Sequence, residues 1–226
     1  TDARDQTTRN RHPTPRKLAS IIVDCRNKAR IREKEIIHAL TVAHHQIGTS
    51  FLSMEQPQLS IDIDRLMARI EALAALGSLD ATEGTSGPDQ KLGCCRLALT
   101  DEDKAGRDLV VTWMKDLGLN VATDGIGNVV ATMPHSAGTW EPGTAPVMTG
   151  SHIDTVRTGG RYDGNLGVLA GLEVIETVQS AGIQLDRPLA VAFFTNEEGA
   201  RFAPDMMGSL VYAGGMPLEA ALTVQG

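Results

Sequence analysis

Five side chains that can bind a metal ion, or work beside one, follow two apolar stretches or lie between them. His152 and Asp154 come directly after the first stretch, and Glu197 and Glu198 come directly after the second. Asp163 lies between them in a segment rich in glycine. Imidazole and carboxylate groups bind zinc and similar ions, and carboxylates can bridge two of them. The set therefore indicates a pair of divalent metal ions.

The spacing of these residues suggests separate roles. Asp154 is two residues from His152, so both side chains leave the same face of an extended chain. Asp154 is then placed to accept the second ring N–H of His152 and fix its tautomer. Glu197 and Glu198 point to opposite sides of an extended chain, so one can bind metal while the other acts as general base. Asp163 lies where neighbouring glycines allow a close backbone approach, and it is the candidate bridging ligand.

The elements that position these residues form a predicted βαβ unit. Residues 147–150 predict a short strand, 165–181 a helix, and 189–195 a strand buried on both faces, because the last run is continuously apolar. Two strands joined through a helix pair in parallel with a right-handed crossover. Ligands bind beyond the carboxyl ends of such strands. The residues that follow the two strands should therefore meet at one edge of the sheet.

Three further segments complete the predicted architecture. Apolar residues at helical spacing predict helices over 63–76 and 101–117, and Thr100 before three acidic residues is typical of a helix start. Residues 128–133 predict another strand. The predicted fold class is α/β, a three-layer domain with a mixed, partly parallel sheet.

Each candidate residue also has a structural explanation when it is taken alone. A histidine at the end of a strand is often only a surface residue, and an aspartate before glycine is common in turns. A pair of glutamates can begin a helix. The metal site is favoured because all of these residues lie at the edge where a parallel sheet collects ligands.

Composition excludes several classes of protein. The 226 residues are 42% hydrophobic and 22% charged, which is typical of a globular chain. No run approaches the roughly 18–20 apolar residues of a membrane span, and no signal peptide is visible. Three cysteines are too few for a disulfide framework, so we expect a reducing, cytoplasmic setting. The net charge of −7 argues against a nucleic-acid partner.

The charge is divided unevenly along the chain. Residues 1–53 hold ten basic and five acidic residues, whereas residues 54–226 hold eleven and twenty-three. We expect residues 1–53 to be a basic leader that is disordered or foreign to the domain.

Three segments resemble the hydantoinase/carbamoylase family of metal-dependent amidohydrolases. They are Gly150–Val156 (GSHIDTV), Gly159–Gly164 (GGRYDG) and Thr195–Phe202 (TNEEGARF). The family includes N-carbamoyl-L-amino-acid hydrolases, β-ureidopropionases and allantoate amidohydrolases, and it belongs to the wider aminoacylase/carboxypeptidase-like group of two-metal hydrolases. The resemblance covers about residues 60–226. It implies that residues 54–226 are the N-terminal portion of a metal-dependent catalytic domain.

The resemblance also implies a role for each candidate residue. His152 and Glu198 would each bind one metal ion, and Asp163 would bridge the two. Glu197 would be the general base, and Asp154 would be the supporting carboxylate. The cofactors would be two divalent ions, Zn²⁺ or else Mn²⁺, Co²⁺ or Ni²⁺.

The activity implied is hydrolysis of N-carbamoyl-L-amino acids or other small ureido acids, and Arg201-Phe202 favours this branch of the wider group. An aminoacylase or dipeptidase is the alternative enzyme, and a truncated, non-catalytic metal-binding homologue is the alternative from another class. Members of the family carry later histidines and a lid/dimerisation domain, and no histidine follows His152 here. We therefore expect negligible activity from the 226 residues alone, and a homodimer for the full-length parent.

Overall fold

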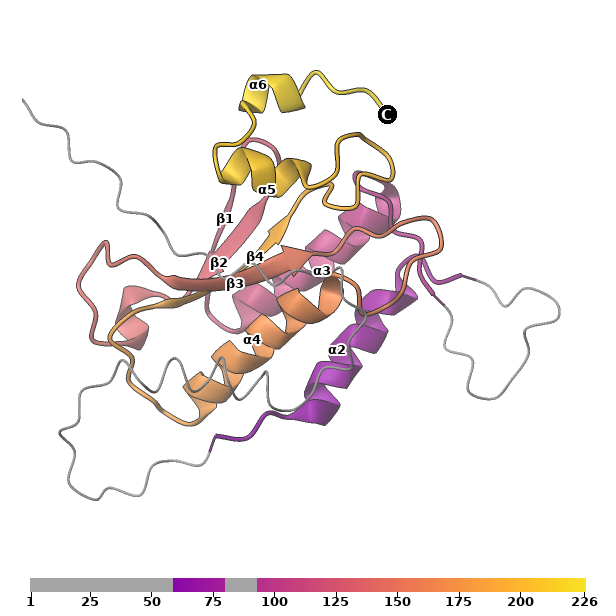
Figure 1. Ribbon diagram of the computed structural model, residues 1–226. Coiled ribbons are helices and arrows are strands. Elements are labelled where there is room, and N and C mark those ends of the chain that lie inside the picture. Colours follow the sequence, from indigo (N-terminus) through magenta and orange to yellow (C-terminus); the bar gives the residue numbers. More distant parts are fainter. Residues whose placement is uncertain (1–58, 80–92) are drawn as a thin grey trace, which may run out of the picture.

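The structure is a computed structural model that describes residues 59–79 and 93–226. The basic leader expected for residues 1–53 lies outside the described residues. In the described part, two helices come first, and the strands of one small sheet follow with the remaining helices (Figure 1).

The sheet has four strands in the order β1-β2-β4-β3. The pairs β1–β2 and β2–β4 are antiparallel, whereas β3 and β4 are parallel. His152, the last residue of β3, is in register with Phe194, the last residue of β4. The two parallel strands therefore end level, and the segments that follow them start side by side. The strand bounds are Asn120–Thr123 for β1, Val129–Thr132 for β2, Val147–His152 for β3 and Leu189–Phe194 for β4.

Three longer helices lie on one side of the sheet, and two short ones lie on the other (Figure 1). Helix α4 packs against β3 and β4, α3 packs against β1, and α2 packs outside on α4. The long helices are α2 (Ile63–Ala75), α3 (Asp101–Asp116) and α4 (Asn165–Ser180). The short ones are α5 (Met207–Tyr212) and α6 (Leu218–Ala221), and one 3₁₀ turn, η1, covers His135–Ala137.

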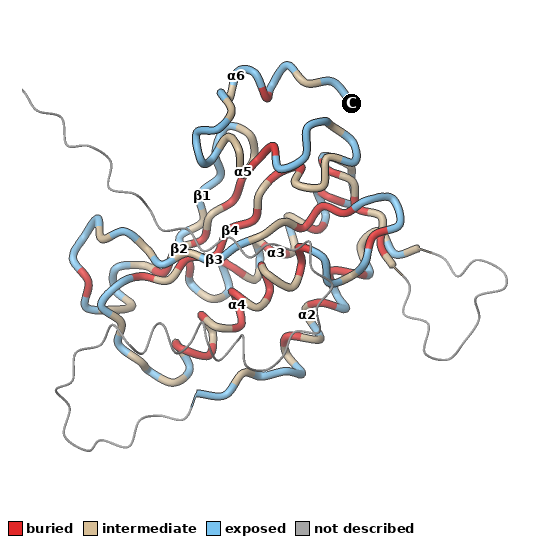
Figure 2. The backbone as a smooth tube through the Cα atoms, viewed as in Figure 1, coloured by how far each residue is buried: buried red, intermediate tan, exposed pale blue. Residues whose placement is uncertain are grey.

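The core lies between the sheet and the three long helices, and Figure 2 shows buried segments on the strands and on these helices. Leu169 and Leu172 of α4 are fully buried, as is Phe193 of β4. Helix α4 can approach the sheet closely because Gly171 has no side chain: a Cβ there would lie 2.7 Å from Cγ2 atoms of both Thr149 and Val191. The tight packing fixes the start of α4 relative to the ends of β3 and β4.

Helix α2 is joined to α4 by a buried ion pair. Glu173 of α4 is fully buried, and its carboxylate accepts hydrogen bonds from Arg65 Nε at 2.8 Å and Arg65 Nη2 at 2.7 Å. The backbone N–H of Asp62 also donates to it, at 2.9 Å. A carboxylate in such a position is tolerated because several charge-assisted hydrogen bonds replace its lost hydration.

The predicted fold class is confirmed, and so are the predicted helices and the parallel βαβ unit. Strand β3 runs two residues beyond the predicted 147–150 and reaches His152 itself. Strand β1 and helices α5 and α6 were not predicted, because their four to six residues carry little periodic pattern. Within the described ranges no helix is long and apolar enough to cross a membrane.

Candidate metal centre

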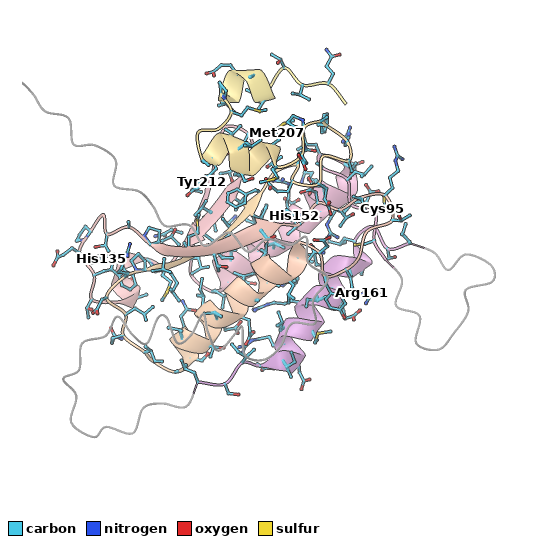
Figure 3. The ribbon with its side chains drawn as sticks, in the orientation of Figure 1. Cys95, His135, His152, Arg161, Met207 and Tyr212 are labelled. Carbon is cyan, nitrogen blue, oxygen red and sulfur yellow. The ribbon has the colours of Figure 1, made fainter. Side chains whose placement is uncertain are left out.

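His152, Asp163 and Glu198 come together beyond the carboxyl ends of β3 and β4. One ligand atom from each lies within 4.8 Å of the others, and this is the one such group in the described part of the chain. His152 ends β3, Asp163 precedes α4 and Glu198 follows β4, so the parallel register brings three distant segments together. Figure 3 shows His152 near the end of β3.

The ring of His152 is oriented so that one nitrogen is free for a metal ion. Its Nδ1 lies 2.9 Å from the backbone carbonyl oxygen of Asp154. Because a carbonyl oxygen only accepts hydrogen bonds, Nδ1 carries the proton, and Nε2 of the neutral ring keeps its lone pair. Nε2 faces the carboxylate of Asp163, 3.9 Å from Oδ1. This is the arrangement of a metal-binding histidine held by a partner on its other nitrogen.

Gly164 makes room for that ring. Its φ of +66° lies in the left-handed region that favours glycine. A Cβ there would lie 2.4 Å from Cε1 of His152, which is closer than any real contact. The glycine-rich loop therefore gives His152 its place beside Asp163.

Asp154 supports the site differently from the expectation. Its carboxylate was expected to accept the His152 ring N–H, but Oδ1 is 3.8 Å from Nδ1, and the backbone carbonyl takes that role. The carboxylate instead accepts the backbone N–H groups of Glu197 and Glu198, each at 3.2 Å. Two adjacent N–H groups match its two oxygens, which a single ring N–H cannot do. Burial raises the pKa of Asp154, although His152 and these hydrogen bonds act against the rise.

The two neighbouring glutamates have different surroundings. Glu197 accepts hydrogen bonds from the backbone N–H of Ser209 at 2.8 Å and from its hydroxyl at 2.9 Å. Glu198 lies with His152 and Asp163. Burial raises the pKa of both carboxyls, and the nearby Asp163 adds to the rise at Glu198. The structure therefore brings Glu198 into the group of three and leaves Glu197 beside it, on Ser209.

Several supporting residues were missed by the sequence analysis. Asn196 is left-handed, with φ of +55°, and turns the chain between β4 and the glutamates. Asn128 is 1% exposed; its side chain accepts from Thr195 N and donates to the carbonyl of Gly208, both at 2.9 Å. Asn128 therefore connects the residue two before Glu197 with the residue before Ser209. Asparagine is common in turns, but that preference does not predict which residues Asn128 and Asn196 contact.

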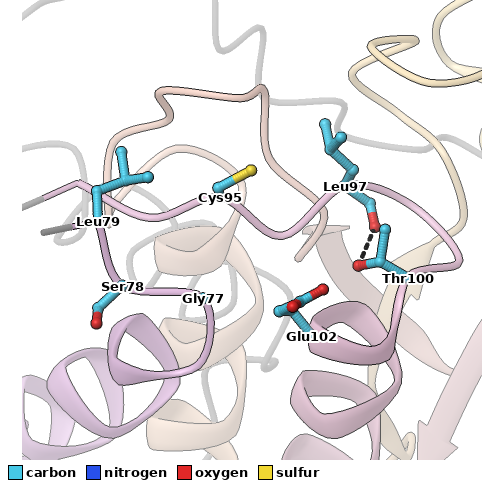
Figure 4. A pocket seen from close by; sticks show the side chains of 7 residues that line it. All are labelled: Gly77, Ser78, Leu79, Cys95, Leu97, Thr100 and Glu102. Carbon is cyan, nitrogen blue, oxygen red and sulfur yellow. Dashed lines mark hydrogen bonds between the residues drawn. The ribbon is translucent and has the colours of Figure 1, made fainter.

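The donor set fits a divalent cation. It combines an imidazole nitrogen with two carboxylate groups, which suits zinc and manganese alike. Cys95 lines a separate pocket between the end of α2 and the start of α3, together with Gly77, Leu97 and Glu102 (Figure 4). None of the five predicted site residues lines that pocket.

Comparisons with known proteins show which family this part of the chain resembles. The model of Peptidase family M28 matches residues 128–221. An N-carbamoyl-L-amino-acid amidohydrolase of Rhizobium meliloti is 42% identical over 161 residues, which is 71% of this chain and 35% of the relative. A ureidoglycolate hydrolase of Arabidopsis thaliana is 34% identical over 167 residues, which is 73% of this chain and 32% of the relative.

A solved structure is also similar to this chain. It is an amidase of the hydantoinase/carbamoylase family from Burkholderia multivorans, 46% identical, with a TM-score of 0.66 over 75% of this chain and 38% of that one. The chain thus spans about a third of the length of the relatives it matches. The residues that match the model of Peptidase family M28 include His152, Asp163 and Glu198. By sequence and by structure, this chain belongs to the hydantoinase/carbamoylase family of amidohydrolases.

Proposed function

We propose that the chain carries the metal centre of an amidohydrolase that cleaves a C–N bond in N-carbamoyl-L-amino acids or related ureido acids. The observation that carries this proposal is the convergence of His152, Asp163 and Glu198 within 4.8 Å, with Glu197 beside them. The named activities of the relatives supply the substrate class.

In this proposal each residue has one task. His152, through Nε2, and Glu198 would each hold one of two divalent ions, and Asp163 would be a ligand of both. Zn²⁺ is the first candidate, followed by Mn²⁺, Co²⁺ and Ni²⁺. When bound, such ions polarise the carbonyl under attack and lower the pKa of water.

Glu197 takes the proton of the attacking water and passes it to the departing nitrogen. Its carboxylate is suited to this because Ser209 holds both oxygens in one orientation. Asp154 supports it indirectly by fixing the backbone N–H groups of Glu197 and Glu198. Dimerisation and a cytoplasmic location, which the resemblance implies, stay predictions.

A substrate panel tests the proposed activity. The whole protein, including any residues beyond these 226, is loaded with Zn²⁺ or Mn²⁺ and offered N-carbamoyl-L-amino acids, allantoate, N-acetyl-L-amino acids and dipeptides. We expect turnover of ureido compounds, abolished by chelation and restored by metal. Turnover of acyl or peptidyl substrates without any ureido compound would show an aminoacylase or dipeptidase instead. We expect the 226-residue chain alone to stay near background.

A further inference from the structure

Arg96 is a fully buried arginine whose four side-chain hydrogen bonds all go to neutral oxygens. Its Nε donates to the carbonyl of Ile153 at 2.7 Å, and its Nη2 donates to the side-chain oxygen of Asn165 at 3.0 Å. Its Nη1 donates to the last turn of α2, to Leu73 O at 2.8 Å and Leu76 O at 2.9 Å. Burying a cation without a carboxylate contact is unfavourable, and these four hydrogen bonds offset part of that cost.

What they hold are the two segments that carry metal ligands. Ile153 is the residue directly after His152, and Asn165 is two residues after Asp163. The backbone N–H of Asn165 donates to the carbonyl of Asp163 at 2.7 Å, and its side-chain nitrogen donates to the carbonyl of Arg161 at 3.1 Å. One guanidinium therefore connects the end of β3 with the glycine-rich loop, and its bonds to Leu73 and Leu76 attach both to the end of α2.

The backbone of Arg96 reinforces the same connection. Its N–H donates to the hydroxyl of Thr155 at 2.8 Å, and its carbonyl accepts the N–H of Thr155 at 2.8 Å. Helix α3 also leaves space for the side chain, because a Cβ on Gly106 would lie 2.8 Å from Cδ of Arg96. The surroundings are thus shaped to keep the guanidinium in one place.

We propose that Arg96 is a positioning residue that sets the separation of His152 and Asp163 and thereby the metal affinity of the centre. The inference rests on the metal centre of the proposed function. Arg96 itself would contact neither the ion nor the substrate. Its effect is to order the two loops before metal binds, so that binding is not opposed by the loss of their freedom.

Zinc titration of the metal-free 226-residue chain by calorimetry tests this, with variants Arg96→Met and Arg96→Lys. We expect Arg96→Met to weaken binding about 10–100-fold, the usual effect of losing a partner that orients a ligand. The zinc affinity of Arg96→Lys should lie between those of the wild type and Arg96→Met, because an ammonium cannot reach the same set of acceptors. The absorption spectrum of bound Co²⁺ should change in both variants, since it reports the geometry of the ligands.

Arg69→Met is the matched control. Arg69 is also largely buried, pairs with Glu176 at 2.6 Å and lies over the ring of Trp113, but it contacts neither ligand-bearing loop. Its loss should lower the melting temperature of the metal-free chain while leaving zinc affinity and the Co²⁺ spectrum unchanged. If Arg96→Met does not fold, Asn165→Ala replaces it, because that change removes only the link to the Asp163 loop.

The outcomes separate the two proposals. If the wild-type chain binds no zinc, the proposed metal centre is wrong and the role of Arg96 falls with it. If the wild-type chain binds zinc, and the folded Arg96 variants or Asn165→Ala bind as tightly with the same Co²⁺ spectrum, the role of Arg96 alone is refuted. Equal losses of affinity in Arg69→Met and Arg96→Met would likewise refute it, since the effect would then follow stability.

Discussion

Glu197 and Glu198 are adjacent in the sequence but contact different groups. Glu197 is held by Ser209, whereas Glu198 lies with His152 and Asp163. Their backbone N–H groups are fixed together by the carboxylate of Asp154. One short segment can therefore supply both a proposed general base, Glu197, and a proposed metal ligand, Glu198, because each carboxylate has its own partners.

This division gives a prediction at the scale of single residues. Glu198→Ala should lose metal from one position, because a centre with few ligands is weakened by the loss of a carboxylate. Glu197→Gln should keep its metal but lower the turnover of the whole protein by roughly 10²–10⁴-fold, the usual range for general acid–base assistance. Metal analysis and rate assays on both variants check this, with the exposed Glu219→Gln as control. If Glu197→Gln empties a position while Glu198→Ala leaves both filled, the assignment is reversed.

Gly164 gives a second prediction at this scale. Gly164→Ala should weaken zinc binding, because the new Cβ would meet the ring of His152 at 2.4 Å. Gly182→Ala is the matched control: its φ is +63°, close to +66° at Gly164, but nothing lies within 4 Å of its Cβ position. Both changes should lower the free energy of unfolding by about 1–2 kcal/mol through left-handed strain. Only Gly164→Ala should change the zinc affinity measured by calorimetry; an equal effect at Gly182 would show that strain alone is responsible.

At the scale of elements, much of the fold could be predicted from the sequence. The apolar run of β4 and the helical periodicity of α4 identified a parallel βαβ unit, and the rule that ligands gather beyond parallel strands placed His152 near Glu198. Such features are local patterns joined by a general topological rule. They needed no knowledge of individual side-chain contacts.

The supporting contacts could not be predicted in this way. The carboxylate of Asp154 lies on backbone N–H groups 43 and 44 residues away, and Arg96 contacts residues up to 69 positions away. Nothing in the sequence near Arg96 distinguishes it from a surface arginine. The partners of a buried polar group depend on how the elements pack, and this information is absent from local spacing.

The ion pair between α2 and α4 gives a prediction about elements. Glu173→Ala should lower the free energy of unfolding by about 1.5–3 kcal/mol, because it removes the two charge-assisted hydrogen bonds from Arg65, while Arg65 keeps Glu176 at 3.2 Å. Asp108→Ala, at the exposed pair with Lys104 on α3, should change it by less than about 1 kcal/mol. Urea unfolding of both variants measures the difference. Similar values for the two would mean that the buried pair does not hold α2 on α4.

At the scale of the whole molecule, the three proposed ligands belong to segments that only the folded chain brings together. His152, Asp163 and Glu198 are supplied by the end of β3, the loop before α4 and the turn after β4. An ion that binds this group binds the folded state and not the unfolded chain, so it should stabilise the fold. At about 100 times the dissociation constant the gain is about 2.7 kcal/mol.

The zinc content of the chain at equilibrium tests most directly whether His152 is a ligand of a metal centre. The measurement compares the wild-type chain, His152→Ala and His135→Ala after dialysis against Zn²⁺. His135 is exposed in η1 and lies away from His152 (Figure 3), which makes it the matched control. We predict saturable zinc binding in the wild-type chain and in His135→Ala, and its loss in His152→Ala. Undiminished binding in a folded His152→Ala, or no binding in the wild-type chain, would contradict the account.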